Sequence, residues 1–569
     1  MIRSKSIFII SVLVCTMFTG SIISMADPLP NRAPNVPIVQ TDMPAGRGFM
    51  PKSLDLSHLN NKGTPGIFMA VQTPASWDWR ESGKVTSVKN QSSCGACYSF
   101  AALANIEARV LIGDSETFDF SENNAKECNF EQTSCDGGNF YDMASFLSQK
   151  GTVLESCDPY VAADVTCNSS CAYIKTLLDW RIISTNAIPS TQDLKDYIYN
   201  YGPIYTSMYA GDGNDNSWLS EINGYDGSYT MHYSGTWPTN HAVTIVGWDD
   251  NLSHAGGTGA WIVKNSWGNS WGGTCGYGSE EGYFTIAYGS ANIGQWSSFV
   301  YDWQDYDNND DILYYDENGW TSSWGYNPST TAWGMCKFVV PSTHYLTRVD
   351  LWTNDVTTDI DVYVYDNYNG VSLSSLLTSE LNSGFLEAGY HSIALSSPPQ
   401  VSAGEDVYVA IKITNASYTF PIVADTVSPA ESATTYISST GSGWYDLGNG
   451  QGDDVAFRLR TSPSLVSAVD DDNDPTKMTY ALSQNYPNPF NPSTTINYTL
   501  ETRSQVTISI YNFLGQKINT IVDQIRPAGS YNVEWDGDNF EGKAVATGIY
   551  FYKIVTDDFT ETKKMLLLK

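Results

Sequence analysis

The sequence predicts an α+β domain followed by two all-β sandwich domains. In the first part, helix-like stretches precede strand-like stretches: helices are expected at 97–112 and 139–150, and strands at 242–247 and 260–264. Helices in one half and strands in the other are typical of an α+β domain with two lobes.

Beyond about residue 296, the pattern changes to short runs with period-two alternation. Examples are 361–366 and 406–412, and Gly, Asn, Ser and Pro lie between such runs. This pattern predicts a β-sandwich. Alternation returns near the C-terminus, as in 506–511 and 548–553, and predicts a second small sandwich of about seven strands.

The 569 residues suggest three or four domains at about 150 residues each. Arg3 and Lys5 precede an apolar run and small residues lie before Asp27, as in a secretory signal peptide. The predicted segments are a signal peptide at 1–26, a Pro-rich pro-segment or linker at 27–73, the α+β domain at 74–292, a β-sandwich at 296–462, an acidic linker at 463–479 and the second sandwich at 480–569.

The chain is strongly acidic, with 30 Lys and Arg against 62 Asp and Glu, a net charge of −32. This balance argues against nucleic acid or an anionic membrane surface as a partner. After the signal peptide, no segment approaches the roughly 18 apolar residues of a membrane span. We expect an exported protein without a transmembrane span.

Export makes the cysteine count informative, because disulfides form in oxidising compartments. Ten cysteines lose Cys15 with the signal peptide, which leaves nine. An odd number requires at least one unpaired thiol. Cys97 is the natural candidate, and Cys336, far along the chain, is another.

The segment from Gln91 to Phe100 places an amide, two cysteines and the start of an apolar helical pattern within ten residues. Cys97 would lie at a helix N-terminus, where the partial positive charge lowers the pKa of a thiol. That is the setting of a nucleophilic cysteine. The Cys94-x-x-Cys97 pair alone also suits a redox disulfide or a zinc site.

A thiolate nucleophile needs a base, a group that orients the base, and donors for an oxyanion. Of the six histidines, His241 is the best base, because it lies at the mouth of a predicted strand. Asn265 can accept the ring N–H of His241, as the third member of a triad does. Trp267 can cover that hydrogen bond, and Gln91 can donate its side-chain N–H to the oxyanion.

These residues occur in motifs that resemble the papain family of cysteine peptidases: Trp77-Asp-Trp-Arg, Gln91-Ser-Ser-Cys94-Gly-Ala-Cys97, Cys135-Asp-Gly-Gly138, Asn240-His241-Ala-Val and Lys264-Asn265-Ser-Trp267-Gly. The resemblance implies a two-lobed fold with a cleft between the lobes. It implies peptide-bond hydrolysis through an acyl-thioester at Cys97, with Gly137 and Gly138 forming a cleft wall along the substrate backbone.

The same resemblance implies a disulfide between Cys94 and Cys135. It also implies that Cys128 pairs with Cys167 or Cys171 and Cys157 with the other, and we favour Cys128 with Cys167. The sequence departs from the family pattern in Tyr98, where Trp is usual, in Asn240, where Asp is frequent, and in residues 27–73, which lack the periodicity of a long helical pro-domain.

Residues 296–462 resemble the lectin-like β-domain that follows some papain-type peptidases, which implies glycan binding. Trp320, Trp324 and Trp333, expected to be exposed, could stack on sugars. The acidic cluster from Asp305 to Asp311 is either a structural calcium site or a solvated loop, and no other cofactor is expected.

Residues 480–569 resemble the C-terminal sorting domain of the type IX secretion system. The resemblance rests on Gln484-Asn-Tyr-Pro-Asn-Pro-Phe490-Asn-Pro, Gly548-Ile-Tyr-Phe-Tyr-Lys553 and the closing Lys563-Lys-Met-Leu-Leu-Leu-Lys569. It implies secretion across the outer membrane of a Gram-negative-type bacterium, to the cell surface or the medium.

Taken together, these features predict a secreted cysteine endopeptidase that acts on polypeptides. The alternative is a surface protein that binds glycans on a peptidase scaffold without turnover.

Overall fold

The computed structural model describes residues 29–34, 47–60, 73–465, 480–485, 487–500, 504–512, 514–526, 529–540, 542–556 and 559–568. The predicted signal peptide and most of the predicted acidic linker lie outside the described residues. Within the described ranges, no helix is long and apolar enough to cross a membrane.

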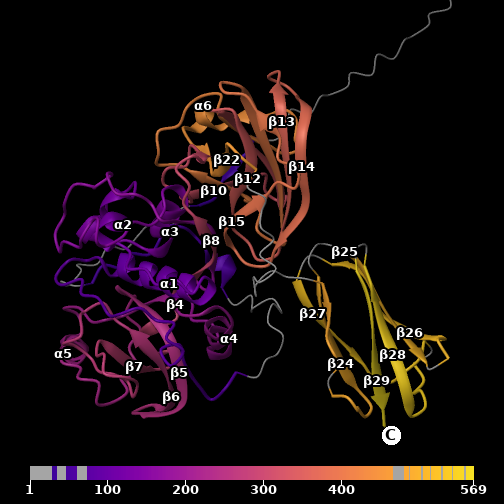
Figure 1. Cartoon of the computed structure of the whole chain (residues 1–569), viewed down its shortest axis with the longest axis horizontal. Helices are drawn as coiled ribbons and strands as arrows, with labels where there is room; N and C mark the ends of the chain where they lie inside the picture. The colour runs from indigo at the N-terminus through magenta and orange to yellow at the C-terminus, as the bar shows by residue number, and fades with distance from the viewer. Residues whose placement is uncertain are drawn as a thin grey trace, which may run out of the picture.

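Three helices form the first lobe of the α+β domain, at the left of Figure 1. Their bounds are Cys97–Gly113 (α1), Glu122–Cys128 (α2) and Phe140–Gln149 (α3). The expected helices at 97–112 and 139–150 are therefore confirmed. The side chains of Ser121 and Asn139 accept backbone N–H groups at the starts of α2 and α3, which satisfies donors that a helix leaves open. The other helices are Thr191–Tyr201 (α4), Asn216–Asn223 (α5) and Leu447–Gln451 (α6), with 3-10 turns at Ser57–Leu59 (η1), Ser134–Asp136 (η2) and Ser290–Asn292 (η3).

One sheet runs from the second lobe into the first β-sandwich, in the order β7-β6-β5-β4-β8-β3-β15-β12-β22-β9, with β2 added beside β5 and β16 beside β12. Its strands are Ser76–Asp78 (β2), Lys175–Ile182 (β3), Ile204–Met208 (β4), His241–His254 (β5), Gly257–Lys264 (β6), Tyr283–Ala287 (β7), Gln295–Asp305 (β8), Asp311–Leu313 (β9), His344–Thr353 (β12), Gly389–Ala394 (β15), Gln400–Val401 (β16) and Phe457–Ser462 (β22). The two parts join where Gly389 and Tyr390 of β15 pair with Arg181 and Trp180 of β3.

The sandwich adds a six-stranded sheet in the order β14-β13-β17-β11-β19-β20 and a four-stranded sheet in the order β1-β10-β18-β21. Ile360, Val362 and Val364 on β13 are buried and alternate with side chains that face away from the core, as the period-two pattern predicts. The strands are Asn31–Arg32 (β1), Ser322–Gly325 (β10), Thr331–Val339 (β11), Thr358–Tyr368 (β13), Leu373–Phe385 (β14), Asp406–Asn415 (β17), Ile422–Asp425 (β18), Thr435–Ser438 (β19), Tyr445–Asp446 (β20) and Asp454–Val455 (β21).

The expectation that three tryptophans of this sandwich are exposed is wrong for two of them. Trp320 is 1% exposed and Trp324 is 3% exposed. Trp320 packs at the junction with the α+β domain, 6.4 Å from Tyr141 of α3 between ring centroids. Trp333 is half-buried on the outer face of the six-stranded sheet, beside Tyr363. Large rings at a domain junction bury more apolar area than they would on the surface.

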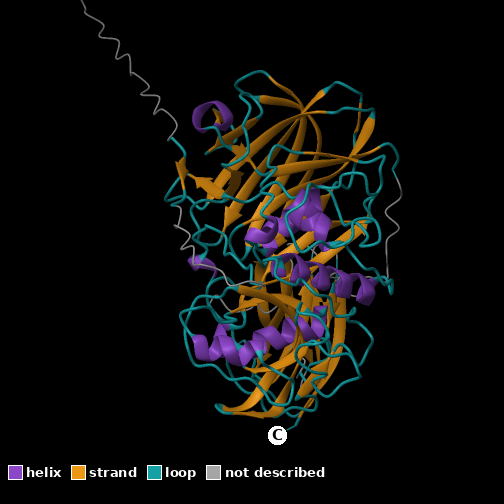
Figure 2. Cartoon of the chain, turned by 90° about the vertical axis from the view of Figure 1, so that its left-hand side faces the viewer, coloured by secondary structure: helices purple, strands orange, loops and turns teal. Residues whose placement is uncertain are grey.

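A buried arginine of the sandwich contacts the helical lobe. The Arg458 guanidinium pairs with the Asp316 carboxylate at 2.8 Å, and both side chains are fully buried. The same guanidinium donates to the hydroxyls of Ser145 and Ser148 on α3. Figure 2 shows the helices between sheet strands above and below them.

The C-terminal sandwich lies to the lower right in Figure 1. A three-stranded sheet, β23-β24-β27, packs on a four-stranded sheet, β26-β25-β28-β29, around a core that includes Trp535 and Tyr552. The strands are Ala481–Leu482 (β23), Thr494–Leu500 (β24), Ser504–Asn512 (β25), Lys517–Arg526 (β26), Gly529–Trp535 (β27), Gly548–Val555 (β28) and Thr560–Leu567 (β29).

Candidate active site

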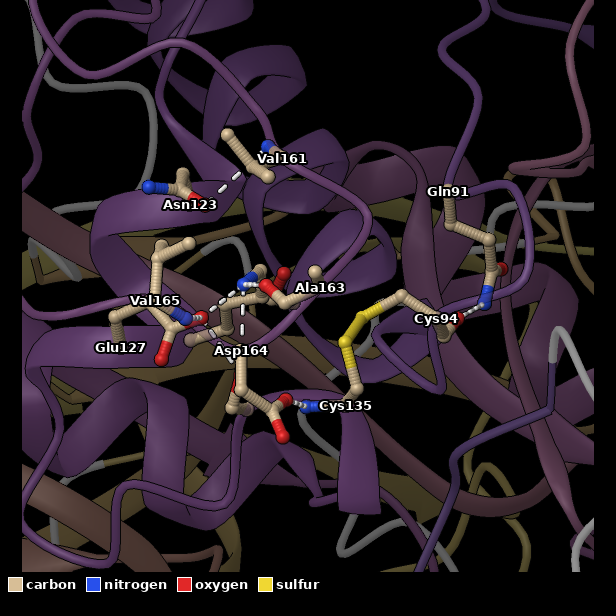
Figure 3. The surroundings of a disulfide bond; sticks show 12 residues. Gln91, Cys94, Asn123, Glu127, Cys135, Val161, Ala163, Asp164 and Val165 are labelled. Atoms are coloured by element: carbon tan, nitrogen blue, oxygen red, sulfur yellow. Dashed lines mark hydrogen bonds and ion pairs between the residues drawn. A yellow bond between two sulfur atoms is a disulfide. The ribbon is translucent and has the colours of Figure 1, made fainter.

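Cys97 is the first residue of α1 and is completely buried. The loop before it is fixed by the disulfide between Cys94 and Cys135, which Figure 3 shows with its surroundings. In that loop the Gln91 side chain donates from Nε2 to the Cys94 carbonyl at 2.8 Å and accepts from the Ser266 hydroxyl at 2.5 Å. Gln91 therefore lies beside the helix start, as the sequence predicts.

His241 begins β5, on the other side of the cleft. Its Nε2 lies 2.8 Å from Oδ1 of Asn265, which follows β6. The Trp267 ring lies 4.8 Å from the imidazole between centroids and covers this pair. The backbone N–H of Ala242, the next residue, donates to Sγ of Cys97 at 3.3 Å. The fold thus brings the four predicted residues Gln91, Cys97, His241 and Asn265 to one place.

Nδ1 is the imidazole nitrogen that Asn265 leaves unused. It is buried without a hydrogen-bond partner. A buried polar atom without a partner is costly, so this nitrogen is available to a group that enters the cleft or to the neighbouring thiol.

A segment from the N-terminal region, residues 47–50, lies across Cys97. The Phe49 N–H donates to the Asn240 carbonyl at 3.1 Å. The Met50 N–H donates to the Gly138 carbonyl at 2.9 Å, and the Gly138 N–H donates to the Gly48 carbonyl at 2.8 Å. These are the backbone contacts that an extended peptide makes with a cleft wall, and Phe49 pairs with Gly138 in parallel.

Glycines allow this close approach on both sides. A Cβ on Gly48 would stand 1.7 Å from the carbonyl oxygen of Gly95. A Cβ on Gly137, which has a φ of +108°, would stand 2.8 Å from the Gly48 carbonyl oxygen. The predicted cleft wall at Gly137 and Gly138 thus contacts a peptide backbone, and that peptide belongs to the chain itself.

Arg47 fixes the start of the segment. Its guanidinium donates to the Ala210 carbonyl at 2.8 Å and to Oδ1 of Asn223 at 2.9 Å. The same group lies 4.7 Å above the Trp267 ring, a favourable cation–π distance. Residues 47–50 carry no signal in the sequence that marks them, because the segment has no periodicity and its contacts are with residues far along the chain.

The covered site keeps its two reactive groups neutral. Burial raises the pKa of the Cys97 thiol to about 12, against the lowering effect of N–H groups from Ala242, Gly48 and Tyr98 and of Arg47. Burial also lowers the pKa of His241 to about 3. The expected lowering of the Cys97 pKa at the helix N-terminus is therefore wrong for this closed form, because desolvation outweighs the helix dipole and the hydrogen bonds.

Three disulfides join Cys94 to Cys135, Cys128 to Cys167 and Cys157 to Cys171, the pairings that the resemblance implies and that we favoured. Cys97, Cys275 and Cys336 are free thiols, so the last two do not form a fourth bridge. In the part of the chain that the structure describes, no three His, Cys, Asp or Glu side chains form a group that could hold a metal ion.

Three family models match the chain. Residues 73–302 match "Papain family cysteine protease", residues 312–457 match "Lectin like domain" and residues 484–568 match "Secretion system C-terminal sorting domain". The α+β domain of this chain thus matches the papain-family model over residues 73–302. The sorting domain indicates type IX secretion to the cell surface or the extracellular space.

Similar curated proteins include cysteine proteinase 1 of Entamoeba histolytica, 31% identical over 231 residues, which are 38% of this chain and 65% of that protein. A viral cathepsin of Choristoneura fumiferana nuclear polyhedrosis virus is 33% identical over 216 residues, 37% of this chain and 59% of that protein. The chain thus spans less than two thirds of the length of these relatives.

Among solved structures, the cysteine protease and lectin-like domains of Cwp84 from Clostridium difficile share the fold. The TM-score is 0.60 at 20% identity, over 74% of this chain and 93% of that one. This similarity covers the α+β domain together with the first sandwich.

Proposed function

We propose that the protein is a secreted cysteine endopeptidase whose nucleophile is Cys97. His241 takes the thiol proton and gives it to the leaving amine, and Asn265 fixes the imidazole orientation. The thiolate attacks the substrate carbonyl to form an acyl-thioester, which water then hydrolyses. The Gln91 side chain and the Cys97 backbone N–H stabilise the oxyanion.

The observation that carries this proposal is the backbone pairing of residues 48–50 over Cys97. It defines a cleft that holds an extended polypeptide against Gly138, with the His241–Asn265 pair on the opposite wall. A polypeptide substrate would make such contacts once the segment has left. We infer that this closed form is the latent one and that release of the segment activates the enzyme.

The test compares the full chain before and after cleavage at a protease site engineered between residues 61 and 72. Hydrolysis of an unfolded protein and labelling by a thiol-directed epoxide should both appear after cleavage. Both should be lost in Cys97→Ser and kept in Cys275→Ser, because Cys275 is a free thiol in another part of the domain.

Unchanged hydrolysis in Cys97→Ser would assign the activity to another catalyst. No hydrolysis by the cleaved parent chain would favour the alternative, a binding protein without turnover. Joint reoxidation of Cys94 and Cys97 would indicate a redox pair, whereas the bond from Cys94 to Cys135 leaves Cys97 alone.

For the lectin-like domain we propose glycan binding, on the strength of its family match over residues 312–457. The same proposal assigns the sorting domain to the type IX secretion machinery as its partner. No calcium ion is assigned to the acidic cluster. Asp305, at one end of it, pairs with Lys175 at 2.6 Å.

A further inference from the structure

We propose that a cavity at the junction of the α+β domain and the lectin-like domain is the oligosaccharide-binding site of this protein. The inference rests on the glycan binding proposed above and gives it a location. The cavity has a volume of about 720 Å³, within the range of small-ligand sites, which occur preferentially at domain interfaces.

Both domains contribute to the walls. Gln149, Lys150 and Thr176 come from the helical lobe and β3, whereas Arg348 and Arg460 come from β12 and β22. The loop 306–310, between β8 and β9, and the first residues of β9 close one side. A site of this kind exists only when the two domains are joined by the continuous sheet.

Two half-buried aromatic rings supply apolar surface. Tyr306 packs on Tyr173 with 5.1 Å between ring centroids. Tyr314 is held near two cations, with Nζ of Lys150 and the Arg458 guanidinium each 5.6 Å from its ring centroid. Rings held by their neighbours lose little freedom when a ligand stacks on them, and the C–H face of a pyranose is such a ligand.

The cavity presents polar groups of both kinds. Oδ1 of Asp310 is buried with no hydrogen-bond partner. Arg348, which also lines the cavity, donates from Nε and Nη2 to Ser392. A carboxylate oxygen accepts hydrogen bonds, a guanidinium has five N–H groups that donate them, and a sugar hydroxyl can do both.

These polar groups limit the class of ligand that the cavity can bind. The lining carries charges of both signs, from Asp307, Asp310 and Asp311 and from Lys150, Arg348 and Arg460, so neither an anion nor a cation alone matches the cavity. A purely apolar molecule would leave the buried Asp310 oxygen without a partner, which is costly. A neutral oligosaccharide meets both demands and covers the two rings.

The test uses the full chain carrying Cys97→Ala, so that binding is measured without hydrolysis. A glycan array identifies a bound oligosaccharide, and calorimetry then measures its affinity. Tyr314→Ala and Tyr306→Ala should each weaken binding by about tenfold or more, whereas Tyr314→Phe, which keeps the ring, should bind like the parent. Tyr363→Ala is the matched control, because Tyr363 lies beside Trp333 on the outer face of the six-stranded sheet.

Loss of binding in Tyr363→Ala with unchanged binding in Tyr314→Ala would place the site on that sheet face and overturn the location. Competition by peptides but not by sugars would assign the cavity to a polypeptide. An array without any bound glycan would refute glycan binding itself and leave the peptidase proposal untouched. Thermal unfolding of each variant confirms that a lost affinity is not a lost fold.

Discussion

Gly48 lies in the N-terminal segment, against the loop that precedes Cys97. Because an added Cβ would stand 1.7 Å from the Gly95 carbonyl oxygen, Gly48→Ala should displace the segment at a cost of about 1–3 kcal/mol. We expect the uncleaved variant to react with a thiol-directed epoxide about 5- to 150-fold faster than the parent.

The matched control is Gly213→Ala, because a Cβ on Gly213 would meet nothing within 4 Å. Its labelling rate should equal that of the parent. Equal rates for Gly48→Ala and the parent would show that residues 47–50 do not limit access to Cys97.

Because His241 is buried in the closed form, the stability of that form depends on pH. Its pKa is lowered to about 3 by burial, from an ordinary value of 6.5, so the open form binds a proton that the closed form excludes. The closed form is therefore fully stable above pH 6.5 and loses stability as the pH falls towards 3. Each pH unit in that window favours opening by up to about 1.4 kcal/mol.

Hydrogen exchange at the amides of residues 48–50 measures this opening. Protection should fall between pH 7 and pH 5 in the parent, beyond the intrinsic change in exchange rate. In His241→Gln, which has no titrating ring, protection should stay constant. The same fall in both proteins would assign the acid response to another group.

At the scale of elements, the first sandwich holds the N-terminal segment. β1 pairs with β10, and the His58 ring stacks on Tyr418 with 3.7 Å between centroids. The Nε2 atom of His58 also lies 2.6 Å from the Asn354 carbonyl oxygen. These contacts flank residues 47–50 on both sides, so the lectin-like domain helps to keep the cleft covered.

Tyr418→Ala should therefore loosen the segment. An aromatic pair contributes about 0.5–1.5 kcal/mol, so epoxide labelling of Cys97 in the uncleaved chain should become about 2- to 12-fold faster. Tyr363→Ala removes a tyrosine from the same sandwich at a distant face and should leave the rate unchanged. A Tyr418→Ala rate equal to that of the control would mean that the anchor lies elsewhere.

The elements themselves were largely predictable from local pattern. The apolar spacing after Cys97 predicts α1, and alternation predicts β13 and β17, because side-chain period and backbone geometry are tied together. The exposure of Trp320 and Trp324 was predicted wrongly. The local sequence around a tryptophan is the same whether its ring meets solvent or another domain, so it does not predict the exposed fraction of the side chain.

At the scale of the whole molecule, Arg458 of the first sandwich, held in a fully buried pair with Asp316 of the same sandwich, donates to two serines on α3 of the helical lobe. Arg458→Ala would leave the Asp316 carboxylate buried without its partner, and breaking such a pair costs about 3–5 kcal/mol. Urea unfolding should show this loss of stability for the part formed by the α+β domain and the first sandwich.

The control for this loss is Lys412→Ala, which removes a partly exposed ion pair with Asp361 in the same sandwich. That pair should contribute less than about 1 kcal/mol. A loss in Arg458→Ala no larger than that in Lys412→Ala would mean that the junction does not depend on the buried pair.

The sequence by itself determined the class of the protein and the residues that meet at Cys97. Gln91, Cys97, His241 and Asn265 each lie in a local motif, and a motif can be recognised from a few neighbouring residues. Only the tertiary structure decided that the cleft is closed by residues 47–50, that one sheet runs through two domains, and that a cavity opens at their junction. Each of these features depends on contacts between residues that are far apart in the chain. Such contacts are decided by packing, desolvation and the close approach of backbones, and these leave no periodic pattern in the sequence.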